Sequence, residues 1–129
     1  MELIGHGIDL VNCRKIEAIL GRHKERFLAR VFTGDELAYS QKHRHSVERM
    51  AGRLAVKEAV MKLLGTGWQS GIAWTDIETL NDKAGKPVVF LRGKVAELAE
   101  QMGIDKISVS ITHTADLAIA SVIGLGKQP

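Results

Sequence analysis

The sequence predicts a mixed α+β fold with an antiparallel sheet at its core, and three observations lead to that class. Segments near both ends of the chain alternate apolar with polar residues, as half-buried strands do. The stretches between them carry apolar residues at helical spacing. The chain has 129 residues, of which 45% are hydrophobic, enough to fill one substantial core. We therefore expect a single domain, residues 1–129, in which helices cover a sheet.

The first predicted strand, residues 3–11 (LIGHGIDLV), has an unusual composition. Side chains alternate along a strand, so Gly5, Gly7 and Asp9 share one face. Glycines inside a strand weaken it, which means that these two need a reason. We expect them to clear space beside Asp9 for a ligand that approaches the backbone. The alternative is that they serve close packing of the strand.

The other elements follow from caps, stops and periodicity. Asn12 and Ser46 belong to the residue types that cap helices well. The sequence TGDE, from Thr33, has the pattern of a capping box, and Gly65 is a typical helix stop. Asn81–Pro87 (NDKAGKP) has the composition of a turn. These signals predict helices over about residues 13–29, from Thr33 onward, over 47–64 and over 93–102, and strands over 77–80, 88–91, 106–112 and 117–123.

The composition excludes several classes of protein. No apolar run approaches the roughly 18 residues of a membrane-spanning helix. The N-terminus lacks a basic start followed by an apolar run, so we expect no signal peptide. Cys13 is the one cysteine, which excludes an intramolecular disulfide and a cysteine-based zinc site. We expect a cytoplasmic protein with no membrane partner.

The net charge of +3 is unevenly distributed along the chain. Residues 14–30 carry six basic and two acidic side chains, and residues 42–62 carry the same numbers. The remainder is acidic, with six basic and eleven acidic residues. This asymmetry indicates an anionic partner, such as a nucleic acid, a phosphate ligand or an acidic protein. Charge alone does not distinguish such a partner from a solvated helix face.

The predicted helix over residues 47–64 carries a carboxylate in an unusual place. At about 100° per residue, Glu58 lies in the middle of an apolar stripe that includes Leu54 and Met61. An ionised carboxylate is costly there unless it is paired or bound to a metal. Two explanations remain open: Lys62, four residues further on, pairs with Glu58, or Glu58 has a function.

Asp9 strengthens the functional explanation because it is a second carboxylate beside apolar and glycine neighbours. Magnesium typically takes one or two carboxylates, with waters and substrate phosphates completing its shell. Asp9 and Glu58 could therefore hold a divalent cation together. The basic residues Arg53, Lys57 and Lys62 of the same helix would then hold the phosphates.

Four motifs resemble those of one protein family. They read GIDLV at residues 7–11, GRLAVKEAVMKLLGTG at 52–67, NDKAGKP at 81–87 and SVSITHT at 108–114. In this order they resemble the holo-acyl-carrier-protein synthases, the small AcpS-type 4′-phosphopantetheinyl transferases. The resemblance covers nearly the whole chain. Thr112 stands where the family pattern leads us to expect a serine, and it keeps the hydroxyl.

The resemblance implies a reaction. The 4′-phosphopantetheine group of coenzyme A would pass to a serine of apo-acyl carrier protein in fatty acid biosynthesis, releasing adenosine 3′,5′-bisphosphate. It implies Mg²⁺ as the cofactor, with Asp9 and Glu58 as metal ligands. The predicted catalytic residues are Glu58, Lys62 and Asp9. We hypothesise that Glu58, or a water that it orients, accepts the proton of the attacking serine.

The resemblance also implies partners and an assembly. The fold would be the 4′-phosphopantetheinyl transferase fold in a homotrimer, with each active site at a subunit interface and no nucleic acid bound. The first helix would receive the acidic carrier protein through Arg14, Arg22 and Arg26. His113 would line the coenzyme A site, the alternative being an ordinary satisfied polar residue. The residues implied for coenzyme A are Arg53, Lys57, Lys62, Gly65, Asn81, Gly85, Pro87, Ser110, Thr112 and His113.

Two rival functions remain open from the sequence. A basic nucleic-acid-binding module is favoured by the two basic segments. A purely structural trimerisation domain is also possible, but it leaves Asp9 and Glu58 without a reason. The sequence does not indicate which carrier proteins are served, whether acylated coenzyme A is accepted, or whether Mn²⁺ replaces Mg²⁺.

Overall fold

The computed structural model describes residues 1–69 and 71–129. Each predicted helix and strand is present, with ends that differ from the predicted ones by a few residues. In chain order the elements are β1 (Glu2–Asn12), α1 (Cys13–Val31), α2 (Gly34–Gln41), α3 (Ser46–Leu64), the short 3₁₀ helix η1 (Trp74–Asp76), β2 (Ile77–Asn81), β3 (Pro87–Leu91), α4 (Gly93–Gln101), β4 (Ile104–Thr114) and β5 (Leu117–Gly126).

The helix ends follow the predicted signals with two differences. Thr33 caps α2 in a complete capping box, and Gly65 ends α3 in the left-handed conformation at φ 73°. Ser46 is the first residue of α3 rather than its cap, since His45 occupies that position without a side-chain hydrogen bond. Helix α1 is interrupted at His23, whose backbone is non-helical at φ −139° and ψ 39°. The first helix is therefore two shorter helices joined by a kink.

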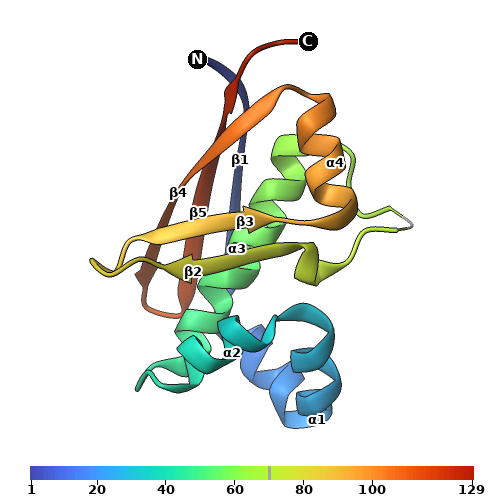
Figure 1. Ribbon diagram of the computed structural model, residues 1–129. Coiled ribbons are helices and arrows are strands. Elements are labelled where there is room, and N and C mark those ends of the chain that lie inside the picture. Colours follow the sequence, from blue (N-terminus) through green and yellow to red (C-terminus); the bar gives the residue numbers. More distant parts are fainter. Residues whose placement is uncertain (70) are drawn as a thin grey trace.

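The long helix α3 is the centre of the architecture. Strands β1, β5 and β4 form an antiparallel sheet in that order, and β2 and β3 form a separate antiparallel pair. In Figure 1, α3 runs between this three-stranded sheet and the β2–β3 pair, with α1 and α2 together at one end and α4 toward the other. The α+β class and its antiparallel pairing are confirmed, but the sheet is divided into two parts.

Strand β1 packs directly against α3, and this contact explains its glycines. A Cβ atom on Gly7 would lie 1.9 Å from the carbonyl oxygen of Ala59, far inside van der Waals contact. A Cβ atom on Gly5 would lie 3.2 Å from the carbonyl oxygen of Leu63. The strand backbone therefore touches the helix backbone, and the predicted space for a ligand is absent at these positions. The ligand interpretation of the glycines is wrong, and close packing is their reason.

The main core lies between α3 and the three-stranded sheet. Small side chains dominate the contact because the helix and the sheet approach so closely. Alanines and valines of α3 and β5 in this core are entirely inaccessible to solvent, namely Ala51, Ala55, Val56, Ala59, Val60, Ala118, Ala120 and Val122. Asp9 lies in the middle of this close contact, since its partner on β5 is Ala120.

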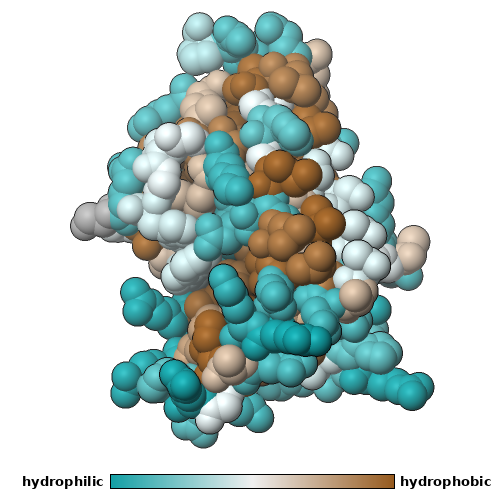
Figure 2. Space-filling view, turned by 180° about the vertical axis from the view of Figure 1, so that it is seen from behind, coloured by the Kyte–Doolittle hydropathy of each residue, from teal (hydrophilic) through white to brown (hydrophobic). Residues whose placement is uncertain are grey.

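The other face of the three-stranded sheet is apolar and exposed in this single chain. Ile8 and Leu10 of β1 are 51% and 53% exposed, and the strand register places Ile119 of β5 beside Leu10. Figure 2, seen from behind, shows hydrophobic surface along the middle of the molecule with hydrophilic surface around it. Among the described residues, no helix is long and apolar enough to cross a membrane.

Candidate active site

A small cavity at the C-terminal end of α3 brings together three predicted site residues, Glu58, Lys62 and Gly65. Because Gly65 ends the helix in the left-handed conformation, the chain turns back and carries Trp68 to the same place. The cavity has a volume of about 290 Å³ and is lined by Glu58, Met61, Lys62, Gly65, Gly67 and Trp68.

Asp9 reaches this region from β1 and forms an ion pair with Lys62. The Nζ atom of Lys62 lies 2.9 Å from Oδ1 of Asp9, and the two side chains are 58% and 18% exposed. The predicted alternative of a Glu58–Lys62 pair within the helix is therefore replaced by a pair between the helix and the strand. Gly7 makes this possible, because it lets β1 come close enough for Asp9 to meet α3.

The electrostatics of the cavity are dominated by its two carboxylates. Burial raises the pKa of Glu58, and the negative charge of Asp9 raises it further. A hydrogen bond from Trp68 and the positive charge of Lys62 act in the opposite direction without cancelling these effects. Two carboxylates thus face one ammonium group, which leaves an excess of negative charge at the cavity.

This donor set fits a divalent cation. A bound cation beside Asp9 and Glu58 would neutralise the excess negative charge, and carboxylate oxygens are the ligands that Mg²⁺ prefers. Within residues 1–69 and 71–129, no group of three or more histidine, cysteine, aspartate or glutamate side chains is placed to hold a metal. Two carboxylates are nevertheless sufficient for Mg²⁺, because it keeps several waters and takes oxygens from substrate phosphates.

Lys57 is the clearest correction to the predicted site. Its side chain is fully buried, and its Nζ atom donates to Oε1 of Glu36 at 2.9 Å and to the carbonyl oxygen of Trp74 at 3.1 Å. It also donates to the carbonyl oxygen of Ile77. All three ammonium protons are thereby used, so Lys57 does not hold a phosphate here. Helix α2 and strand β2 cover the face of α3 that carries Arg53 and Lys57, which the sequence predicted to hold phosphates.

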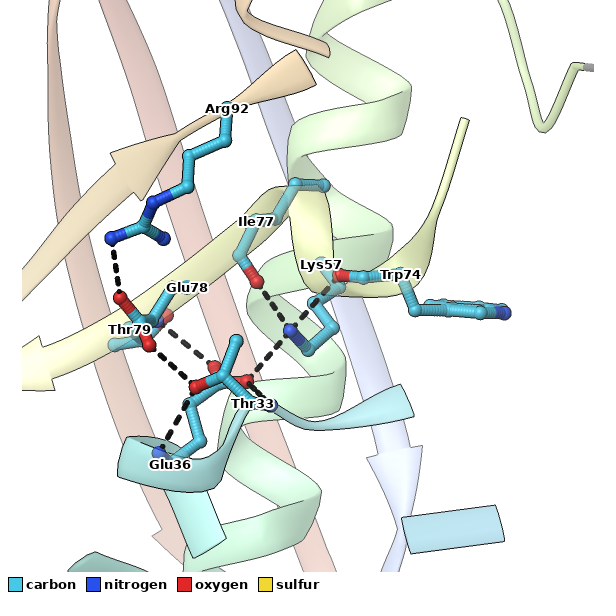
Figure 3. Close-up of polar contacts among 8 residues, drawn as sticks. All are labelled: Thr33, Glu36, Lys57, Trp74, Ile77, Glu78, Thr79 and Arg92. Carbon is cyan, nitrogen blue, oxygen red and sulfur yellow. Dashed lines mark hydrogen bonds and ion pairs between the residues drawn. The ribbon is translucent and has the colours of Figure 1, made fainter. Parts of the chain in front are cut away.

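Lys57 belongs to a polar cluster that ties three elements together (Figure 3). Glu36 closes the capping box of α2 and accepts the backbone N–H of Thr79 in β2 at 2.9 Å. Glu78, the neighbouring residue of β2, accepts the hydroxyl of Thr33 and pairs with Arg92 at 2.9 Å. Burial opposes the ionised form of Glu78, but these partners outweigh it and lower its pKa.

Arg53, one helical turn before Lys57, is also buried, with 3% of its surface exposed. One guanidinium nitrogen donates to Oδ1 of Asn81 at the end of β2. Asn81 in turn donates to the carbonyl oxygen of Gly85 at 2.8 Å, inside the predicted turn. Pro87 follows as the first residue of β3. Within the described chain the buried Nε atom of Arg53 has no hydrogen-bond partner.

The remaining residues predicted for coenzyme A lie on β4. Ser110 and Thr112 are exposed on the outer face of the sheet, whereas His113 points toward α3 and contacts the carbonyl oxygen of Glu48 at 3.0 Å. A Cβ atom on Gly52 would lie 3.0 Å from Nε2 of His113, so this ring packs against the helix. The structure thus shows a partner for His113, and its role toward coenzyme A stays a prediction.

The predicted residues therefore form two groups that are separated within one chain. The first group surrounds the cavity at Glu58, and the second extends from Arg53 along the Asn81–Pro87 turn to β4. Strand β5 lies between β1 and β4, which puts these edge strands about 10 Å apart. In addition, Asp9 faces α3 whereas Ser110 and Thr112 face away from it.

The basic side chains of α1 are exposed as expected, but they do not form one straight row. Arg14 is 77% exposed at its side chain and pairs with Asp116 at 3.0 Å. Arg22 and Arg26 lie on either side of the kink at His23, beside a shallow cavity of about 460 Å³ that the residues from 20 to 26 line. The kink changes the direction of the helix between them, which the sequence pattern did not indicate.

Three residues near the site were not among the predicted ones. Trp68 packs against Trp74 with ring centroids 3.8 Å apart and ring planes tilted by 37°. Glu36 was assigned to a capping box, and nothing in that pattern indicates that its carboxylate also neutralises Lys57. Tyr39 lies against Arg53, a contact that needs the packing of α2 on α3.

Comparison with known proteins agrees with the fold. The sequence profile of the 4′-phosphopantetheinyl transferase superfamily matches residues 5–121. A holo-[acyl-carrier-protein] synthase from Solibacter usitatus is 42% identical over 121 residues, which cover 94% of this chain and 97% of that protein.

Solved structures give the same result. The holo-[acyl-carrier-protein] synthase of Neisseria meningitidis has a TM-score of 0.87 at 28% identity, covering 96% of this chain and 99% of that one. The Helicobacter pylori synthase, solved in complex with coenzyme A, has a TM-score of 0.81 at 30% identity and covers 93% and 99%. The chain therefore belongs to the 4′-phosphopantetheinyl transferase superfamily, and within it to the holo-[acyl-carrier-protein] synthases. The resemblance found in the four sequence motifs is confirmed.

Proposed function

We propose that this chain transfers the 4′-phosphopantetheine group of coenzyme A to a serine of apo-acyl carrier protein, in fatty acid biosynthesis. The observation that carries the proposal is a cavity lined by Glu58 and Lys62, with Asp9 paired to Lys62, in a chain related over its length to holo-[acyl-carrier-protein] synthases. The nucleic-acid alternative loses support, because Arg53 and Lys57 of the second basic segment are buried.

The chemistry requires phosphoryl transfer without a protein nucleophile. The serine oxygen bonds to the β-phosphorus of coenzyme A, the bond from that phosphorus to the bridging oxygen breaks, and adenosine 3′,5′-bisphosphate leaves. Lys62 would neutralise charge on the pyrophosphate, since its exposed ammonium group can turn from Asp9 to a phosphate. Asp9 and Glu58 would hold Mg²⁺, which when bound supplies Lewis-acid polarisation of phosphoryl oxygens.

The serine must also lose a proton, and we assign its removal to Glu58 or to a water that Glu58 orients. The raised pKa of Glu58 makes it a better proton acceptor than an ordinary exposed carboxylate. Its position at the cavity wall, next to Lys62, supports this assignment.

One assay tests the reaction. The chain is incubated with coenzyme A, Mg²⁺ and an apo carrier protein, and mass spectrometry is used to look for a gain of about 340 Da on the carrier. We expect the gain to be abolished by a chelator and by Asp9→Asn. No gain under any of these conditions, together with salt-dependent and sequence-independent retention on DNA, would favour the nucleic-acid alternative.

We further propose a homotrimer with active sites between subunits. Two observations support this assembly. The apolar outer face around Ile8 and Leu10 is larger than single scattered apolar residues and is typical of an interaction surface. The two groups of predicted site residues are also separated within one chain, so a second copy would be needed to bring them together.

A cytoplasmic location also stays a prediction, which rests on the single free cysteine.

Mixing two variants, each impaired in a different group of site residues, tests the interfacial site. Glu58→Gln removes the first group and Asn81→Ala weakens the second, and the two variants are co-expressed with different tags. If the groups come from different subunits, random mixing gives about a quarter of the sites two intact groups, and activity returns in the doubly tagged species. If each site lies within one chain, mixing restores nothing. Light scattering gives the number of copies independently.

Helix α1 is the proposed docking surface for the carrier protein. Arg14, Arg22 and Arg26 are exposed and positive, and the carrier protein that the resemblance implies is acidic. We expect Arg14→Glu to raise the KM for the carrier protein severalfold and to leave the KM for coenzyme A unchanged, with an effect that fades at high salt. Equal effects on both substrates would indicate misfolding, because Arg14 also pairs with Asp116.

A further inference from the structure

Helices α2 and α3 are joined by two parallel contacts, one helical turn apart. Glu36 meets Lys57 in the buried ion pair, and Tyr39 meets Arg53, whose guanidinium carbon lies 4.1 Å from the centre of the Tyr39 ring. The spacing is regular, three residues on α2 and four on α3, which places both pairs on facing sides of the helices.

Both pairs continue to β2, and they reach its two ends. Lys57 donates to the carbonyl oxygen of Ile77, the first residue of the strand. Arg53 donates to Oδ1 of Asn81, the last residue. The two basic side chains of α3 therefore fix the position and the end of this strand, and only the Arg53 contact leads on into the turn.

The Arg53 guanidinium is held by an aromatic ring as well as by Asn81. Its central carbon lies over the face of the Tyr39 ring, 4.1 Å from the ring centre, and the ring of His43 lies against Tyr39 with centroids 4.5 Å apart. A cation is attracted to an aromatic face, so the Tyr39 ring limits the positions that the guanidinium and its hydrogen-bond donors can take. Without this ring, the long side chain of Arg53 would have several rotamers available.

From these contacts we infer that Tyr39 is a positioning residue for the Asn81–Pro87 turn. The ring orients Arg53, Arg53 holds Asn81, and Asn81 donates to the carbonyl oxygen of Gly85 in the middle of the turn. The turn is an exposed loop with its own hydrogen bonds to Asp82, and the Arg53–Asn81 contact connects it to the rigid helix α3. This inference deepens the proposed function, because that turn is predicted to contact coenzyme A.

Hydrogen exchange gives a test that needs no activity. The backbone N–H groups of Ala84 and Lys86 donate to the Asp82 side chain at 2.9 Å, and that of Gly85 donates to its carbonyl oxygen at 2.9 Å. We expect Tyr39→Leu to speed exchange of these amides about twofold to thirtyfold, the range that a cation–π contact spans. Tyr39→Phe keeps the ring and should exchange like the wild type.

Kinetics give the second test. In the phosphopantetheine transfer assay, we expect Tyr39→Leu to raise the KM for coenzyme A by a similar factor, with kcat and the KM for the carrier protein unchanged. Leu37→Ala is the matched control, because Leu37 lies on the same helix and packs against the apolar cluster of Leu28, Val31, Phe32 and Met50. It should lower the unfolding temperature without the selective change in KM.

A double-mutant cycle decides whether the effect passes through Asn81. In an Asn81→Ala background, Tyr39→Leu should change neither the exchange of the turn nor the KM any further. The inference is wrong if Tyr39→Leu leaves both quantities at wild-type values, if Leu37→Ala reproduces the rise in KM, or if the two substitutions add. If the chain does not transfer phosphopantetheine at all, the exchange result still stands, and it separates a failed inference from a failed function.

Discussion

Two consecutive residues of α3, Lys57 and Glu58, lie in opposite surroundings. The ammonium group of Lys57 is fully buried, and its three protons go to Glu36 and to two carbonyl oxygens. Glu58 lies at the wall of a cavity, where burial and the charge of Asp9 raise its pKa. The first charge is balanced and completely hydrogen-bonded, whereas the second shares an excess of negative charge with its neighbour.

The difference shows how a charged residue on one helix can serve structure or chemistry. A buried charge with all its partners supplied has nothing left with which to bind a ligand, so Lys57 determines how α2, α3 and β2 fit together. A half-buried carboxylate beside another one is unfavourable until a cation or a proton arrives, and this is the condition of many catalytic groups. The sequence spacing alone does not separate the two cases.

The largest expected effect comes from breaking the buried ion pair between Glu36 and Lys57. Lys57→Met leaves the Glu36 carboxylate buried without its cation, and we expect a loss of about 3–5 kcal/mol in the free energy of unfolding. Chemical denaturation followed by circular dichroism measures it. The double variant Glu36→Gln/Lys57→Met should recover part of the loss, because the glutamine amide carries no charge but can still accept the backbone N–H of Thr79.

The same two variants also test whether Lys57 has a purely structural role. The folded fraction of Lys57→Met should transfer phosphopantetheine with nearly normal kcat. A large fall in kcat that the double variant does not repair would mean that Lys57 acts on the substrate, contrary to its burial.

Substitution of Glu58 at the cavity should have the opposite result, a loss of activity without a loss of stability. We expect Glu58→Gln to lower kcat/KM by about 10² or more, the size of losing one positioned catalytic group, with no loss of stability. Steady-state kinetics at saturating Mg²⁺ and thermal unfolding of the same samples check both parts. Near wild-type turnover would show that Glu58 is neither the base nor a needed metal ligand.

Much of this arrangement could be predicted from the sequence, and the reason lies in local signals. The capping box at Thr33, the stop at Gly65 and the alternation along β4 each depend on a few neighbouring residues, and each was confirmed. The four motifs led to the correct family, and they named Asp9 and Glu58 together although 49 positions separate them.

What the sequence did not predict depends on contacts between distant segments. The burial of Arg53 and Lys57 follows from α2 and β2, which come from other parts of the chain and cover this face of α3. The reason for Gly7 lies in the carbonyl oxygen of Ala59 on another element. The kink at His23 has no sequence signal, since neither proline nor glycine occupies that position.

Gly7 determines where Asp9 lies, because it sets the distance between β1 and α3. We expect Gly7→Ala to destabilise the fold by about 1–3 kcal/mol, since the added Cβ would meet the Ala59 carbonyl oxygen and must push the strand away. Asp9 would move with the strand, so activity should fall even in the folded fraction. Gly34→Ala is the control, because its Cβ would meet nothing within 4 Å. Equal stability of the two variants would mean that β1 shifts without resistance.

The smallest expected effect is a difference in pH dependence between two glutamates. The pKa of Glu78 is lowered in the folded state, so its contribution to stability is present above the free-glutamate value of about 4.3 and is lost as the pH falls through the folded-state pKa. The pKa of Glu58 is raised, so its contribution is present below that value and is lost as the pH rises through its folded-state pKa. We therefore expect Glu78→Gln to be less stable than the wild type at pH 7, with a difference that shrinks in acid. Glu58→Gln should be equal to or more stable than the wild type at pH 7, with a gain that disappears in acid. Thermal unfolding from pH 4 to pH 7 measures both stability differences. If Glu58→Gln, like Glu78→Gln, were less stable than the wild type at pH 7, the cavity would not disfavour the charge of Glu58.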